Sequence, residues 1–314
     1  MKIISGTANK AFADKISSYL DKPLCNVNID TFKDGEKSII IEENVRKHDC
    51  FIIQPTGPSQ NGSPNDNFME ILILVDALKR GSANSVTVVM PYYGYERQDR
   101  KDYSRAPISA RVIATCLEAL KVDRVITFDL HAGQIQGFFD MPVDNLFTTP
   151  LFARYIKKNI KSKNFICVSP DAGAIERTRA LATKINADLA IIDKRRPEPG
   201  KSKVMNIIGN VKGKDCIIID DIIDSGGTII NAADALNKKG AKNVYVFITH
   251  AVLSGNAISN IQKSRIKKLV ITDTIDNSKK IKKANKIQVL SISQLMAEAI
   301  KRISNSTSVS SLFN

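Results

Sequence analysis

The chain has 314 residues and carries 46 Lys and Arg against 32 Asp and Glu, a formal net charge of +14. This length suits two domains that each bury a core, and no apolar run is long enough to cross a bilayer, so a membrane is not expected as a partner. The 5 cysteines contain no C-x-x-C pair, which argues against structural zinc and a disulfide framework and favours a reducing cytoplasm.

Strand-like and helix-like patterns alternate along the chain, which predicts an α/β fold with mainly parallel sheets flanked by helices. In the first half the patterns predict strands near 2–5, 24–29, 38–42, 50–54, 86–90 and 124–128, and helices over 8–20, 66–80 and 107–120. In the second half they predict strands near 165–168, 188–192, 216–219, 244–249, 269–271 and 287–290, and helices over 172–185, 226–239 and 291–302. We place the domain boundary near 144–150, giving domains 1–146 and 147–314, with 291–314 as a segment that can pack back on the first domain.

Polar motifs follow several first-half strands. The turn 32–36 carries an aromatic side chain and two carboxylates, and the loop 91–101 is dense in hydrogen-bonding groups. Either is equally compatible with a plain surface loop. His131 follows the strand 124–128, at the strand end where open α/β sheets place their ligands. A lone histidine is as often a structural residue as a functional one.

In the second half, Asp171 follows the strand 165–168 in an equivalent place. His131 and Asp171 are therefore candidate ligands for a divalent cation, directly or through its water. The loop 193–201 is cationic, and its two prolines and glycine predict no regular structure and a mobile lid. Cations on a closing loop suit a phosphoryl-transfer transition state, although a solvated basic loop is the ordinary interpretation.

The most informative segment is 216–228. A buried, β-branched strand is predicted to end at two adjacent carboxylates, Asp220 and Asp221, which can accept hydrogen bonds from sugar hydroxyls or hold a hydrated Mg²⁺. The loop from Asp224 to Thr228 then opens a helix, so its backbone N–H groups can converge on an anion. An ordinary glycine turn after a strand has no need of three aspartates in five residues. The segment therefore predicts a ribose-phosphate site.

Taken in order, six motifs resemble those of the ribose-phosphate pyrophosphokinase family, in its phosphate-regulated bacterial class. They are Phe-x-Asp-Gly-Glu at 32–36, Tyr-Gly-Tyr-x-Arg-Gln-Asp-Arg at 93–100, Asp-Leu-His-Ala at 129–132, Ser-Pro-Asp at 169–171, Asp-Lys-Arg-Arg at 193–196 and Asp-Asp-x-x-Asp-Ser-Gly-Gly-Thr at 220–228. The resemblance implies two phosphoribosyltransferase-like domains, the first with the ATP motifs and the second with the ribose 5-phosphate loop. It implies a cytoplasmic homo-oligomer, typically a hexamer, that uses Mg²⁺ and ATP, with inorganic phosphate as a candidate activator.

The resemblance also implies an activity. The family transfers the β,γ-diphosphoryl group of ATP to the 1-hydroxyl of ribose 5-phosphate, giving phosphoribosyl pyrophosphate (PRPP) and AMP for nucleotide biosynthesis. The catalytic residues would be Lys194 and Arg196, and the metal residues His131 and Asp171. ATP would be bound by Phe32, Asp34, Gly35, Glu36, Arg97, Gln98, Asp99 and Lys101, with the turn 32–36 reaching the adenine from a neighbouring subunit. Ribose 5-phosphate would be bound by Arg196, Asp220, Asp221, Asp224, Ser225, Gly226, Gly227 and Thr228.

The chain departs from the family pattern at Lys33, Glu96, Ala174 and the segment 101–105, which puts effector control rather than catalysis in question. A non-catalytic regulatory paralogue is the main alternative function. A nucleobase phosphoribosyltransferase would share 220–228 but lack the ATP motifs.

A third alternative is nucleic-acid binding by the basic residues between 262 and 302. They have no aromatic interleaving, and no nucleic-acid-binding signature is present, so a solvated face is preferred and nucleic acid is not expected as a partner.

Overall fold

The structure is a computed structural model that describes residues 1–162, 164–198 and 201–313, without the side chains of 194–198 and 201–205. The chain forms two compact units. Unit 1 comprises Met1–Leu146, Asp273–Asp276 and Ser291–Asn314, and unit 2 comprises Phe147–Thr272 and Asn277–Leu290. The second unit is thus interrupted once, by 273–276, and the segment 291–314 that follows it returns to the first unit.

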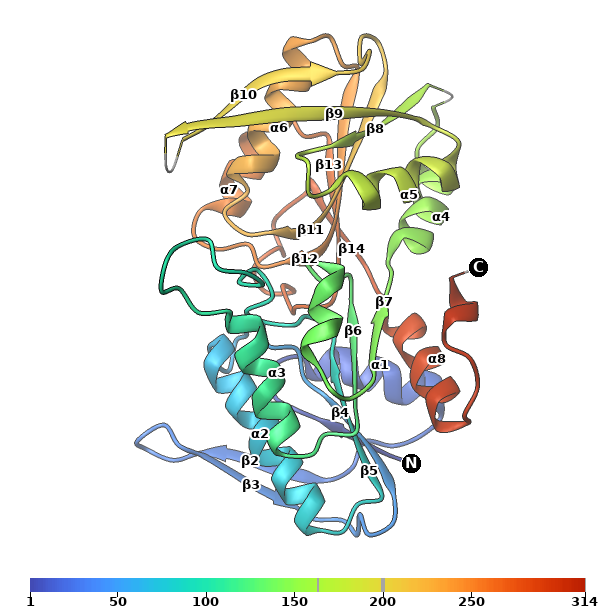
Figure 1. Ribbon diagram of the computed structural model, residues 1–314. Coiled ribbons are helices and arrows are strands. Elements are labelled where there is room, and N and C mark those ends of the chain that lie inside the picture. The colour runs from blue at the N-terminus through green and yellow to red at the C-terminus, as the bar shows by residue number, and fades with distance from the viewer. Residues whose placement is uncertain (163, 199–200, 314) are drawn as a thin grey trace. The chain divides into compact units, whose positions relative to one another are not determined.

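Within the described residues, unit 1 is built on a five-stranded parallel sheet in the order β1-β4-β5-β6-β7 (Figure 1). The strands are β1 (Lys2–Ser5), β4 (Asp49–Ile53), β5 (Ser85–Met90), β6 (Arg124–Phe128) and β7 (Val143–Leu146). The helices are α1 (Lys10–Leu20), α2 (Pro64–Arg80), α3 (Ser109–Ala119) and α8 (Ser293–Ser304), with short 3-10 helices η1 (Gly133–Phe138) and η2 (Ser310–Leu312).

The core of unit 1 follows from alternating apolar side chains along its strands. In β4, Cys50 and Ile52 face one cluster together with Ile71 and Leu74 of α2 and Ile113 of α3. Figure 1 shows α2 and α3 on that side of the sheet, whereas α1 lies beside α8 on the other. Because both faces are covered, the strands read as nearly continuous apolar runs.

Helix α2 begins at a capping box. The Ser63 hydroxyl accepts from the backbone N–H of Asp66 at 3.3 Å, and the Asp66 carboxylate accepts from the N–H of Ser63 at 2.7 Å. Pro64 occupies the first turn, where its missing N–H costs nothing. The sequence therefore starts this helix two residues before the predicted position 66.

A separate antiparallel hairpin, β2 (Val27–Thr31) with β3 (Lys37–Ile41), belongs to unit 1 but joins neither large sheet. The apolar side chains at its base pack against the α2 and α3 cluster; they are Val27, Ile29, Ile39 and Ile41. Its turn, 32–36, is exposed at every position, and Gly35 there has φ +99°. The hairpin therefore carries a fully exposed tip on a half-buried base.

Asp273 connects the late segments of the chain to unit 1. Its carboxylate pairs with Lys15 of α1 at 3.0 Å and accepts from the backbone N–H of Ile292 at 2.9 Å, and its carbonyl accepts from the Asn9 side chain at 2.9 Å. Asn9 is also the N-cap of α1. One residue thus joins the start of α1 to the strand-to-helix connection before α8.

Unit 2 contains a seven-stranded sheet in its described part, ordered β10-β9-β8-β11-β12-β13-β14 and parallel except for β10. The strands are β8 (Phe165–Ser169), β9 (Asp188–Glu198), β10 (Lys201–Ile208), β11 (Asp215–Ile223), β12 (Asn243–Ala251), β13 (Lys268–Thr272) and β14 (Ile287–Leu290). The helices are α4 (Thr149–Asn159), α5 (Ile175–Ile185), α6 (Gly227–Lys238) and α7 (Ala257–Lys263). Helices α6 and α7 pack with one face of this sheet, and α4 and α5 with the other.

The predicted mixed α/β class with mainly parallel sheets is confirmed, but two local predictions are wrong. The strand predicted to end at 219 continues as β11 to Ile223, so Asp220 and Asp221 lie within it.

The segment 193–201, predicted to lack regular structure, belongs largely to an antiparallel strand pair. Pro197 is tolerated there because β9 pairs with β8 only as far as Ile191, and its pairing with β10 is irregular. Elements β7, α4, β10 and α7 were not predicted.

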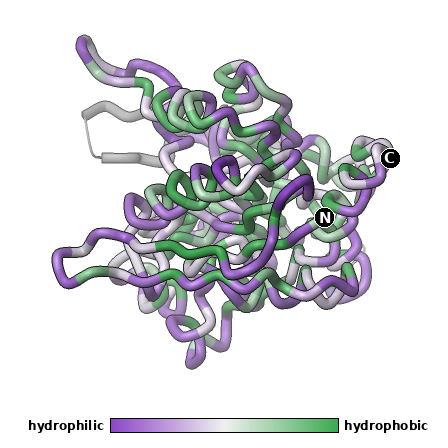
Figure 2. Tube along the Cα trace, turned by 90° about the horizontal axis from the view of Figure 1, so that it is seen from below, coloured by the Kyte–Doolittle hydropathy of each residue, from purple (hydrophilic) through white to green (hydrophobic). Residues whose placement is uncertain are grey.

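Hydropathy follows the fold. Figure 2 shows hydrophilic residues along the projecting loops and hydrophobic runs in the strands inside.

Four cysteines are buried and form no disulfide: Cys25, Cys50, Cys167 and Cys216. Burial raises the pKa of the Cys167 thiol to about 12. None of the helices in the described ranges combines the length and apolar character that a membrane span requires.

Candidate functional site

In unit 2, the carboxyl end of β11 presents two adjacent carboxylates. Asp221 is 4% exposed, and its carboxylate lies 3.5 Å from the guanidinium of Arg177 in α5. The backbone N–H of Asp221 donates to the Asp220 carboxylate at 3.0 Å. Strand β8 pairs with β11 only as far as Ile218, but β12 pairs with β11 from Asp215 to Ile223 and so holds the backbone of both aspartates.

Asp220 is in an environment that disfavours its charge. Burial raises the pKa of its carboxyl well above the ordinary value, and the neighbouring Asp221 and Asp171 raise it further, while Arg177 opposes them. The repulsion between these neighbouring carboxylates can be reduced by a proton, by a bound cation or by hydroxyl groups of a ligand that donate hydrogen bonds. The local electrostatics therefore favour a ligand that brings positive charge or hydrogen-bond donors.

The loop between β11 and α6 has the form expected of an anion site. Gly226 is the N-cap of α6 with φ +80°, and Ser225, Gly227 and Thr228 are exposed around it. Asp224 accepts a hydrogen bond from the Ser254 hydroxyl, which fixes the start of the loop. The first backbone N–H groups of α6, free of intrahelical partners in any helix, are available to bind phosphate oxygens.

Gly226→Ala is expected to raise the KM for a sugar phosphate about tenfold, because a side chain in the left-handed region costs roughly 1–2 kcal/mol, which the free loop avoids by leaving the conformation that binds phosphate. The added Cβ would meet nothing closer than Ile230 Cδ1 at 3.6 Å, so the cost is backbone strain rather than crowding. Gly240→Ala is a matched control, since its φ is +84° in a turn outside the candidate site. Equal KM changes in the two variants, measured by steady-state kinetics, would contradict the role of the loop.

Asp171 and Arg177 lie close to the two aspartates of β11 in unit 2. The Asp171 carboxylate accepts from the backbone N–H of Ala174 at 3.2 Å, at the start of α5. Arg177 lies on the first turns of the same helix. Sequence reasoning predicted Asp171 but missed Arg177. The structure brings Asp171 into the electrostatic environment of Asp220, together with Arg177.

In unit 1, the loop after β5 is held close to the chain at Gly94. The Gly94 N–H donates to the Thr56 hydroxyl at 2.6 Å, and a Cβ on Gly94 would lie 2.5 Å from the Thr56 carbonyl oxygen.

Arg97 and Gln98 follow with exposed side chains, and the Gln98 side chain accepts from the Ser109 hydroxyl. The Asp99 carboxylate accepts from Gln134 at 3.3 Å, whereas Lys101 is exposed. The backbone is thus fixed while the polar side chains face solvent.

His131 lies at the carboxyl end of β6 with an exposed side chain. Its backbone N–H donates to the carboxylate of Glu96 at 2.9 Å, and Glu96 is 0% exposed. Asp129 just before it has φ +36°. Glu96, which departs from the family pattern, therefore links the loop that carries Arg97 to the loop that carries His131, a role that sequence reasoning missed.

The hairpin tip brings together the predicted residues 32–36. The N–H of Phe32 donates to the carbonyl of Glu36 at 2.8 Å, and the N–H of Glu36 donates to the Asp34 carboxylate at 3.1 Å. Phe32 is 58% exposed. The tip is thus an ordered turn that presents an aromatic ring and carboxylates to solvent.

The side chains of Lys194 and Arg196 lie outside the described residues, so their predicted roles stay predictions. Among the residues whose side chains are described, no group of three or more His, Cys, Asp and Glu is arranged to hold a metal ion. His131 lies in unit 1 and Asp171 in unit 2.

Comparison with known proteins identifies the family. The model for the N-terminal domain of ribose phosphate pyrophosphokinase matches residues 1–120, and that for the phosphoribosyl synthetase-associated domain matches residues 194–314. The ribose-phosphate pyrophosphokinase of Rhizobium meliloti (strain 1021) is 50% identical over 314 residues, covering 100% of both chains. That of Hyphomonas neptunium is 52% identical over 315 residues, again covering 100% of each. The chain belongs to the ribose-phosphate pyrophosphokinase family.

A solved structure agrees with this assignment. The crystal structure of phosphoribosylpyrophosphate synthetase from Mycobacterium smegmatis matches with a TM-score of 0.91 and 36% sequence identity, covering 97% of this chain and 99% of that chain. The predicted resemblance to the ribose-phosphate pyrophosphokinase family is therefore confirmed. So are the enzyme class and the α/β fold that the resemblance implied.

Proposed function

We propose that the chain transfers the β,γ-diphosphoryl group of ATP to the 1-hydroxyl of ribose 5-phosphate, giving PRPP and AMP. The observation that carries this proposal is full-length identity of about half to ribose-phosphate pyrophosphokinases, combined with an acidic strand end directly before a glycine loop that opens a helix. The reaction is an in-line displacement at phosphorus, so the protein contributes positioning and charge neutralisation.

In this proposal ribose 5-phosphate binds in unit 2. The 5-phosphate accepts hydrogen bonds from the loop from Asp224 to Thr228, at the positive end of α6. The sugar hydroxyls donate to Asp220 and Asp221, which relieves the repulsion between these carboxylates. Arg177 holds Asp221 in place, because it lies 3.5 Å from that carboxylate.

ATP binds to exposed groups of unit 1. Arg97, Gln98, Asp99 and Lys101 contact the nucleotide from the loop after β5. The tip residues Phe32, Asp34, Gly35 and Glu36 contact the adenine of a neighbouring subunit. Lys194 and Arg196 stabilise the negative charge of the transition state, and Arg196 also contacts the sugar phosphate.

Mg²⁺ fits the donor set of this chain. Carboxylate oxygen is the ligand that Mg²⁺ prefers, and Asp171 adds negative charge beside Asp220. We assign Asp171 and His131 to the metal, directly or through its water molecules. When bound with ATP, Mg²⁺ neutralises charge on the phosphate oxygens.

The assembly is proposed to be a cytoplasmic homo-oligomer, in keeping with a tip that serves a neighbour, and a hexamer by family resemblance. Inorganic phosphate is the proposed activator.

The decisive experiment is incubation of the purified protein with Mg²⁺, ribose 5-phosphate and ATP labelled at the β-phosphate, in the presence and absence of inorganic phosphate. We expect the label to move into PRPP with an equal amount of AMP. Formation of ADP, or no reaction at any phosphate concentration, would refute the assignment and favour the regulatory paralogue.

A further inference from the structure

A buried ion pair lies between the exposed hairpin tip and the core of unit 1. The Lys37 ammonium lies 3.6 Å from a carboxylate oxygen of Glu70, and the two side chains are 8% and 0% exposed. Neither residue belongs to the motifs that carry the proposed function. Removing both charges from water costs free energy, so the pair is not explained by a gain in stability alone.

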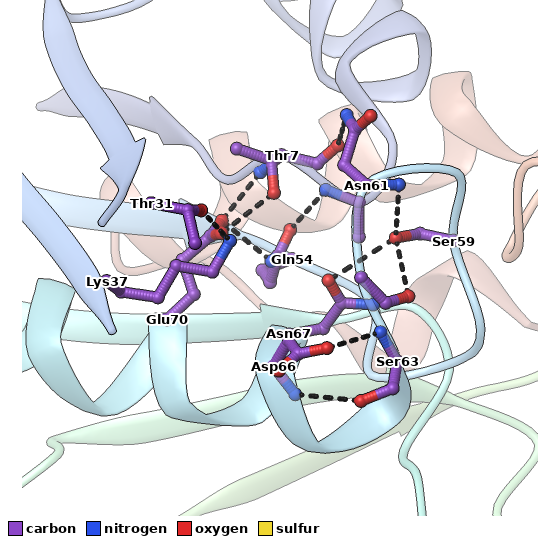
Figure 3. A network of polar contacts seen from close by, with 12 residues as sticks. Thr7, Thr31, Lys37, Gln54, Ser59, Asn61, Ser63, Asp66, Asn67 and Glu70 are labelled. Carbon is purple, nitrogen blue, oxygen red and sulfur yellow. Dashed lines mark hydrogen bonds and ion pairs between the residues drawn. The ribbon is translucent and has the colours of Figure 1, made fainter. Parts of the chain in front are cut away.

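Glu70 is fixed by the interior of unit 1. It lies on the buried face of α2, and its carboxylate accepts from the N–H and the hydroxyl of Thr7 at 2.6 and 2.7 Å. It also accepts from the Gln54 side chain at 2.8 Å, whose own oxygen accepts from the N–H of Ala8 at 3.0 Å. Figure 3 shows these groups converging on the Glu70 carboxylate. The carboxylate is therefore a rigid acceptor joined to the loops that follow β1 and β4.

Lys37 joins this rigid acceptor to the hairpin tip. It lies opposite Thr31 in the β2–β3 register, and its ammonium donates to the Thr31 hydroxyl at 3.1 Å. These two residues flank the turn 32–36 on either side. One ammonium thus ties both ends of the turn to α2, as the dashed lines in Figure 3 indicate.

The other contacts of the hairpin cannot do this. Its apolar side chains, Val27, Ile29, Ile39 and Ile41, lie nearer the base and pack against the core. Apolar packing is non-directional, and an isolated two-stranded sheet is only marginally stable. Among the described residues, the polar contact that joins the hairpin to the core beyond the pair Ile29–Ile39 is that of Lys37.

We propose that the Lys37–Glu70 ion pair is a positioning device that fixes the hairpin tip for ATP binding. This inference rests on the proposed function, in which Phe32, Asp34 and Glu36 contact the adenine. Without the pair, the tip samples orientations in which these side chains miss the base, and only a fraction of molecules is competent to bind. The apparent affinity for ATP falls by that fraction, whereas the sugar-phosphate loop is unaffected.

The test is Lys37→Met, which keeps the length of the side chain and removes its charge. We expect the KM for ATP to rise about tenfold, with kcat at saturating ATP and the KM for ribose 5-phosphate changed by less than about twofold. Hydrogen–deuterium exchange of peptides covering 31–37 should become faster. Lys37→Arg should restore most of the ATP affinity, since a guanidinium can pair with the same carboxylate. Lys10→Met is the control, because Lys10 is an exposed lysine at the start of α1.

Three results would overturn the proposal. The first is an unchanged KM for ATP, and the second is unchanged exchange at the tip. The third is an equal rise in both KM values with a lower melting temperature, which indicates a merely structural pair. If the wild-type protein forms no PRPP, the proposed function fails, while the exchange measurement still decides whether Lys37 holds the tip.

Discussion

Asp220→Asn is expected to lower the rate of PRPP formation about tenfold, because a charge-assisted hydrogen bond to the sugar is replaced by a neutral one, at a loss of roughly 1–1.5 kcal/mol. The same substitution is expected to stabilise the protein without ligands. An amide can donate to Asp221, as a protonated carboxyl does, and can still accept from the Asp221 N–H. The variant should therefore separate binding from folding at one position.

The sign of the stability change follows from the pKa. The carboxyl pKa of Asp220 is higher in the folded state than in the unfolded chain, so the folded state binds the proton more tightly. The free energy of unfolding therefore falls as the pH rises from the ordinary carboxyl pKa through the raised one, and stays lower above it. Asp220→Asn removes this loss, so its melting temperature should exceed that of the wild type by a few degrees at neutral pH.

The measurement is a thermal unfolding series in chelator at several pH values, with activity assayed in parallel. The advantage of the variant should shrink below about pH 4, where an ordinary carboxyl is protonated in both states. Asp234→Asn, a partly exposed carboxylate on α6, serves as control and should change neither property. A variant less stable than the wild type at neutral pH would contradict the electrostatic account of Asp220.

Gly6→Ala is expected to cause a large loss of stability in unit 1. An added Cβ would lie 2.3 Å from the Gln54 side-chain oxygen and 2.8 Å from a Glu70 carboxylate oxygen. These atoms cannot retreat freely, because the same oxygens accept hydrogen bonds from Thr7 and Ala8. Overpacking and a broken buried network together should cost roughly 2–4 kcal/mol.

Urea unfolding followed by circular dichroism checks this expectation. Gly137→Ala is the matched control, because a Cβ there meets no atom within 4 Å and the same methyl group is added. Similar midpoints for the two variants would mean that the network around Glu70 yields easily. The Lys37 proposal would then lose its rigid partner as well.

The sequence predicted best the elements whose pattern is dictated by burial on both faces. Runs such as Cys216–Ile219 and Ser85–Met90 have little alternative to a central parallel strand. It failed for β7, a short edge strand that carries Asp144 and Asn145, and for α4, whose Pro150 at the first turn resembles a linker. It found only the first part of β9 and missed β10, because the irregular pairing beyond Ile191 accommodates Pro197 in a way that composition does not reveal.

The candidate site shows a similar division. The motif at 220–228 is local, so its residues could be predicted from their spacing, whereas those at 93–100 were singled out only by the family resemblance. Other contacts join residues that are more than thirty positions apart along the chain. They are Arg177 with Asp221, the Glu96 carboxylate with the His131 N–H, and Lys37 with Glu70. Such pairs depend on how helices and strands pack. The only local sign was a carboxylate, Glu70, on the apolar stripe of α2.

The return of 291–314 to unit 1 has a consequence for biosynthesis. Helix α8 lies beside α1, so one of the first elements to leave the ribosome must wait for one of the last. Unit 2, by contrast, is complete once residue 290 has emerged. A nascent chain halted before α8 therefore leaves α1 without the helix that packs against it in the finished chain. The N-terminal half of this protein matures last, and chaperones that protect apolar surface would be needed most for it.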